Sequence, residues 1–102
     1  MGKSQRDKGA RGEREFAELV GGQRVPLSGA MDGYWNDVKL PNGMEAEVKR
    51  RKGGFNQLYQ WVLDEREKPD IVAIRTDRRP WLVAMTLETF QDLIGGRQDW
   101  TK

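Results

Sequence analysis

The chain consists of successive segments in which apolar residues recur among polar ones. In each segment the spacing of the apolar residues predicts the secondary structure. Apolar residues recur at helical spacing from Gly9 to Val20, and Gly21-Gly22 is typical of a helix end. The later blocks predict strands over 23–26, 34–40 and 44–50, a helix over 55–67, strands over 70–76 and 81–86, and a helix over 87–94. Helices separated by strands predict an α/β sandwich with a mixed β-sheet, whose antiparallel part comes from hairpins.

A hairpin is predicted at Pro41-Asn42-Gly43, because Asn and Gly tolerate positive φ. This hairpin would set Asp37 and Glu47 on adjacent strands. Side chains two residues apart on a strand share one face, so Glu47 and Lys49 are expected side by side. Such a pair can hold a metal ion and orient water.

Glu13 falls inside the apolar arc of the first predicted helix, at about 100° per residue. A carboxylate there needs a partner, because burying it unpaired is costly. The partner is either a metal ion or, in the alternative interpretation, a nearby Arg or Lys. Asp37 alone could likewise be a solvent-facing strand residue, and Glu45, on the same face as Glu47, is expected as a charge at the rim of the site.

The amino-acid composition excludes several kinds of catalytic and metal-binding site. At 102 residues the chain is expected to be a single domain. It has no Cys and no His, which excludes a structural zinc site, a His-based nuclease and a Ser-His triad. The absence of Cys also suits an intracellular protein. No apolar run approaches a membrane span and the start is polar, so we expect no membrane association and a cytoplasmic location.

The formal net charge is only +2, but the basic residues are bunched. One cluster lies in the N-terminal segment, whose residues 1–8 are expected to form a flexible basic arm. A second cluster is the unbroken basic run at 49–52. Arg75, Arg78 and Arg79 bracket a predicted turn. Such clusters suit contacts with phosphates, and the alternative is an ordinary solvated surface.

Several stretches resemble the archaeal-type Holliday junction resolvases, metal-dependent nucleases of the PD-(D/E)XK superfamily. In chain order they are Glu13, Arg24-Val25-Pro26-Leu27-Ser28-Gly29, Asp37 and Glu47-Val48-Lys49. The resemblance is closest over residues 9–52, and beyond them it rests on the order of the elements. One departure is Asn36, which stands where the superfamily's nominal motif has Pro. The resemblance implies a restriction-endonuclease-like fold, a three-layer sandwich with a mixed central β-sheet flanked by helices.

The resemblance also implies roles for single residues. The metal ligands would be Asp37, Glu47, the Val48 carbonyl and Glu13, while Lys49 would be the catalytic lysine. Ser28 would belong to a mobile loop beside the scissile phosphate and is counted with the catalytic residues. Oxygen ligands suit Mg²⁺, with Mn²⁺ as a substitute, and the number of metal ions per site stays open.

The implied activity is paired, symmetric hydrolysis of four-way DNA junctions. Two alternatives stay open: a related nuclease acting on flaps, ends or duplex DNA, and a non-catalytic nucleic-acid-binding module of the same fold. The basic residues that we expect to contact DNA are Arg11, Arg14, Arg24, Arg50, Arg51 and Lys52.

The second predicted helix is apolar around roughly 200° of its circumference, twice the stripe needed to cover one core face. Some of this surface is expected to face a partner. The resemblance implies a homodimer, and the residues expected at its interface are Phe55, Tyr59 and Trp61. The alternative is a helix buried by its own domain.

Overall fold

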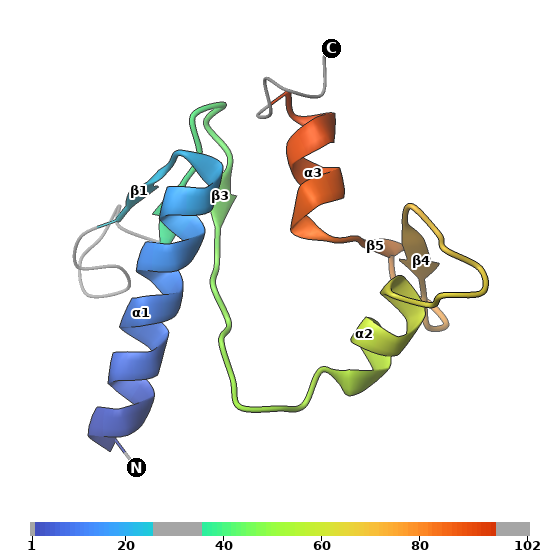
Figure 1. The fold of residues 1–102 in the computed structure, drawn as a ribbon, viewed down its shortest axis with the longest axis horizontal. Coiled ribbons are helices and arrows are strands. Elements are labelled where there is room, and N and C mark those ends of the chain that lie inside the picture. The colour runs from blue at the N-terminus through green and yellow to red at the C-terminus, as the bar shows by residue number, and fades with distance from the viewer. Residues whose placement is uncertain (1, 26–35, 96–102) are drawn as a thin grey trace. The chain divides into compact units, whose positions relative to one another are not determined.

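The computed structural model describes residues 2–25 and 36–95, with the side chains of the first helix given from Lys8 onward. The chain divides into two compact units, residues 1–52 and 53–102, each with its own secondary structure (Figure 1). The described residues form three helices and two small antiparallel sheets, so the chain is a small α/β protein. We expected one mixed sheet. Every observed pairing instead joins strands that follow one another along the chain, and such local pairings are antiparallel.

Helix α1 (Gly2–Val20) starts earlier and ends as predicted. The expected start at Gly9 was wrong, because polar residues with adequate helix propensity extend a helix that later turns have already nucleated. At the other end Gly21 has φ 67°. The Gly21 N–H donates to the Glu18 carbonyl (3.2 Å) and the Gly22 N–H donates to the Ala17 carbonyl (2.8 Å). These two bonds are the Schellman arrangement that ends helices at Gly.

The first sheet contains β1 (Gln23–Arg24), β2 (Val38–Lys39) and β3 (Glu45–Ala46), in that spatial order. The predicted hairpin between β2 and β3 is confirmed. The Gly43 N–H donates to the Leu40 carbonyl (3.0 Å), and the Leu40 N–H donates to the Met44 carbonyl (2.8 Å). Gly43 has φ 94°, so it supplies the positive φ that the turn requires.

The core of the N-terminal unit is small. Among the described side chains of this unit, the buried apolar ones are Ala17, Val38 and Leu40, and α1 packs on β1 and β2. Gly12 on α1 is also buried. A Cβ at Gly12 would stand 2.9 Å from the Arg50 Cβ, so the absence of a side chain lets the chain after β3 lie against the helix.

The C-terminal unit contains α2 (Asn56–Val62), β4 (Val72–Ile74), β5 (Leu82–Ala84) and α3 (Leu87–Leu93). Helix α2 is shorter than predicted because Asp64 starts a separate turn. The Asp64 carboxylate accepts the N–H groups of Glu67 (2.9 Å) and Arg66 (2.8 Å). These two bonds lower the pKa of Asp64 below its ordinary value.

Helix α3 follows the prediction. The Thr86 hydroxyl accepts the Thr89 N–H (3.2 Å) as an N-cap, and Gly95 follows the helix with φ 73°. Within the described ranges, no helix has the length and apolar content that crossing a membrane requires.

Candidate functional site

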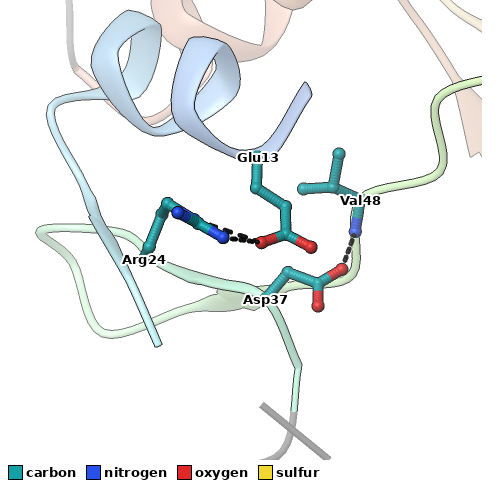
Figure 2. A network of polar contacts seen from close by, with 4 residues as sticks. All are labelled: Glu13, Arg24, Asp37 and Val48. Atoms are coloured by element: carbon teal, nitrogen blue, oxygen red, sulfur yellow. Dashed lines mark hydrogen bonds and ion pairs between the residues drawn. The ribbon is translucent and has the colours of Figure 1, made fainter. Parts of the chain in front are cut away.

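Asp37 is held in place through both its main chain and its side chain. Its N–H donates to the Ala46 carbonyl (2.9 Å), and its carbonyl accepts the Val25 N–H (2.9 Å). Asn36, directly before it, has φ 57°, so the chain bends as it enters β2. Asp37 is only 9% exposed, and its Oδ2 accepts the Val48 N–H at 2.8 Å (Figure 2). The interpretation of Asp37 as a solvent-facing strand residue is therefore wrong.

Glu47 and Lys49 lie side by side, as their spacing predicts. The Lys49 Nζ stands 3.3 Å from the Glu47 Oε2, and the side chains are 61% and 49% exposed, respectively. The predicted strand over 44–50 is too long, however, since β3 ends at Ala46. The Val48 N–H is bonded to a side chain, so the backbone ladder does not continue through it.

Glu13 has an arginine partner. Its Oε1 accepts hydrogen bonds from the Arg24 Nε (3.1 Å) and Nη2 (2.8 Å), and the Glu13 side chain is 23% exposed. This contact matches the alternative interpretation, in which a nearby cation satisfies the carboxylate on the apolar face. Arg24, expected to bind DNA, is thus engaged in an intrachain ion pair. In Figure 2 the Glu13 carboxyl group is directed to Arg24 and the Asp37 carboxyl group to the Val48 N–H.

The predicted acidic ligands are not gathered into one cluster. Within residues 2–25 and 36–95, no group of three or more Asp and Glu side chains has an arrangement that could hold a metal ion. The Glu47 carboxylate faces Lys49, whereas the Asp37 carboxylate faces the Val48 peptide. The donor chemistry nevertheless fits a hard cation, because carboxylate and carbonyl oxygens are the ligands that Mg²⁺ prefers. Ser28 lies outside the described residues.

The predicted DNA contacts are at exposed positions. Arg11 and Arg14 are exposed on α1, and the run Arg50-Arg51-Lys52 is exposed after Lys49. Their placement at the surface suits contacts with phosphates.

The sequence interpretation did not predict the contacts of three further residues, Gly12, Gly22 and Asn36. Gly12 admits Arg50 to the helix surface, and Gly22 lies against the Lys39 carbonyl. The Asn36 Nδ2 donates to the Glu45 Oε1 (2.9 Å) beside the bend. An isolated Gly inside a helical pattern is a signal of close approach that could have identified Gly12.

Comparison of the chain with protein-family models, with curated proteins and with solved structures gives no match. The resemblance to resolvases therefore depends on the sequence motifs alone.

The Glu13–Arg24 contact yields a testable expectation. In a double-mutant cycle with Glu13→Gln and Arg24→Gln, urea unfolding should give a coupling energy of about 0.2–1 kcal/mol, the range for a partly exposed ion pair. If the chain has the nuclease activity that the resemblance implies and Glu13 serves its metal site, Glu13→Gln should lower the cleavage rate at saturating DNA beyond the effect of Arg24→Gln. Equal effects on that rate would leave Glu13 with a purely structural role.

Proposed function

We propose that this protein is a Mg²⁺-dependent, structure-selective DNA endonuclease of the archaeal Holliday junction resolvase type, with a restriction-endonuclease-like fold. The observation that supports the proposal best is the 2.8 Å bond from the Val48 N–H to the Asp37 carboxylate. This bond joins Asp37, a predicted metal ligand, to the central residue of the Glu47-Val48-Lys49 motif. A carboxylate that served only as a surface charge would not make this part-buried contact.

In this proposal Asp37, Glu47 and the Val48 carbonyl hold the metal ion, and Glu13 completes the site directly or through water. When bound, Mg²⁺ supplies a Lewis acid that polarises the phosphate and acidifies water. Lys49 orients the attacking water and stabilises negative charge on the phosphate. The Glu47–Lys49 ion pair must open for these roles. Because both side chains are about half exposed, that opening costs only about 0–1 kcal/mol.

The proposed enzyme acts as a homodimer. Each chain has residues for one such site, whereas resolution of a junction requires two symmetric cuts. The exposed apolar surface of α2 supports a dimer, since no residue of this helix is buried and both Tyr59 and Trp61 are exposed.

The deciding experiment is incubation of the purified protein with a synthetic four-way junction, with and without Mg²⁺. Linear duplex, flap and single-stranded DNA of matched sequence are the controls, and sedimentation in the same buffer gives the oligomeric state. We expect Mg²⁺-dependent, paired symmetric incisions in the junction by a dimer. Preferential cutting of flaps or duplex would instead identify the related nuclease.

A second candidate function is a non-catalytic nucleic-acid-binding module. The two intrachain ion pairs favour it, because Glu13 and Glu47 each already hold a basic side chain. Tight junction binding with no cleavage in either Mg²⁺ or Mn²⁺ would establish this function and exclude the endonuclease.

The basic run after the site should act through phosphates. Replacing Arg50, Arg51 and Lys52 by Gln should weaken binding to junctions of different sequence alike, and should flatten the slope of log K against log salt by about 0.9 per lost phosphate contact. Lys68→Gln, which removes an exposed charge in the other unit, is the control and should leave the slope unchanged. A loss confined to some junction sequences would contradict this role.

A further inference from the structure

We propose that the β4–β5 hairpin carries a stacking site for an unpaired base of single-stranded DNA. Trp81 provides the stacking surface, and Arg75 and Arg79 contact the phosphates. This site lies entirely within the C-terminal unit and shares no residue with the candidate metal site. The inference therefore goes beyond the proposed nuclease activity and does not depend on it.

The hairpin borders a hollow of about 640 Å³. Its wall combines residues of β4, of β5 and of the turn between them with Trp61 from α2, the helix drawn beside this hairpin in Figure 1. Volumes of about 300–1,000 Å³ are typical of sites for small organic ligands, so the hollow can admit a nucleobase. Apolar and aromatic groups with a few charged ones make up this wall.

Trp81 is the central feature of the hollow. It is 63% exposed, although a Trp side chain is among the largest apolar surfaces that a protein can bury. The Arg75 guanidinium carbon lies 5.9 Å from the centre of the Trp81 ring. The Arg75 Nε–H also donates to the Arg79 carbonyl at 2.8 Å, which fixes the guanidinium beside the indole. Nucleobases stack on indole rings and on guanidinium planes, and this pair presents both.

The charged side chains that line the hollow favour an anionic ligand. These side chains, Arg75 and Arg79, are both cationic, and none of the described residues that line the hollow is acidic. The Arg79 N–H donates to the Thr76 carbonyl (3.2 Å) in the connecting turn, where Arg78 adopts φ 65°. This turn sets the arginines around an aromatic surface, an arrangement complementary to a base flanked by phosphates. Duplex DNA keeps the faces of its bases inside the stack, so the occupant we infer is single-stranded.

The test is fluorescence anisotropy of a labelled oligothymidylate of about a dozen nucleotides, titrated with the full-length protein at low salt in EDTA. Trp81→Leu keeps an apolar side chain but removes the aromatic face, and we expect it to weaken binding by about 5- to 150-fold, the range for loss of one stacked base. Trp81→Phe should retain most of the affinity. Arg79→Gln should weaken binding and reduce its salt dependence, whereas Arg66→Gln, which does not line the hollow, should do neither.

An abasic oligonucleotide of equal length separates stacking from phosphate contact. The wild-type protein should bind the abasic oligonucleotide more weakly than it binds oligothymidylate. The Trp81→Leu variant should bind the abasic oligonucleotide as tightly as the wild-type protein does. Equal binding of the two oligonucleotides by the wild-type protein would overturn the proposal, as would undiminished oligothymidylate binding by a folded Trp81→Leu variant. If circular dichroism shows that Trp81→Leu does not fold, the abasic comparison on the wild-type protein decides. Because EDTA removes the metal, an absence of nuclease activity leaves every result interpretable.

Discussion

Asp37→Asn is expected to lower the rate of Mg²⁺-dependent junction cleavage by about 10²- to 10³-fold, the effect of removing one preorganised electrostatic group. The fold should survive, because the Asn side-chain oxygen can still accept the Val48 N–H that Asp37 now accepts at 2.8 Å. The substitution thus removes the negative charge and keeps the hydrogen bond. Single-turnover cleavage with excess protein measures the rate, and thermal unfolding measures stability.

Two further variants serve as a control for the loss of charge and as a test of the hydrogen bond. Glu45→Gln removes the same charge from an exposed side chain of β3 that is bonded to Asn36, and it should cleave and unfold like the wild type. Asp37→Ala also removes the acceptor of the part-buried Val48 N–H, so it should lose about 1–3 kcal/mol of stability in addition to activity. A folded Asp37→Asn variant that cleaves at the wild-type rate would remove Asp37 from the catalytic role.

The features that sequence predicted correctly are those with a local cause. The end of α1 follows from Gly21-Gly22, and the turn between β2 and β3 follows from Gly43, whose φ of 94° few other residues adopt. The helix predicted over 87–94 is likewise observed as α3, and its N-cap contact lies within its own first turn. In each case the residues that determine the structure are neighbours in the chain, so their spacing carries the information.

The sequence pattern did not identify the particular partner where a side chain makes a tertiary contact. Periodicity placed Glu13 on an apolar face but could not identify Arg24, eleven positions later, as its partner. The strand prediction extended through Val48 because alternation does not reveal that its N–H is bonded to the Asp37 side chain. Helix α2 was extended past Asp64 for a different and local reason, since apolar spacing does not register a carboxylate that accepts the N–H groups two and three residues later.

In the candidate site, too, the local features were predicted and the contacts between distant residues were not. The pairing of Glu47 with Lys49 follows from the two-residue period of an extended chain and was predicted. The bend at Asn36 was not predicted. The close approaches at Gly12 and Gly22 were not predicted either, because each involves a residue distant in the sequence, Arg50 and Lys39 respectively. Among the described residues, every strand pairing joins strands that are neighbours in the chain, whereas the parallel pairs of the predicted mixed sheet would join strands distant in sequence.

Gly22→Ala is expected to destabilise the protein by roughly 3 kcal/mol or more, at the upper end for inserting a methyl group into packed structure. A Cβ at Gly22 would stand 2.5 Å from the Lys39 carbonyl oxygen and 3.3 Å from the Val38 Cγ1. Neither atom can move cheaply. Val38 is fully buried, and β2 is paired on one side with β1 and on the other with β3.

Gly9→Ala is the matched control, because a Cβ at Gly9 meets no atom within 4 Å. Within α1 this change should raise stability by about 0.5–1 kcal/mol, the difference between Gly and Ala in a helix. In thermal unfolding, Gly22→Ala should therefore lower Tm by more than about 10 °C while Gly9→Ala raises it by a few degrees. Equal Tm values for the two variants would mean that α1 does not end against the Lys39 carbonyl. Because Asp37 adjoins the displaced strand, Gly22→Ala should also reduce cleavage at temperatures where the protein stays folded.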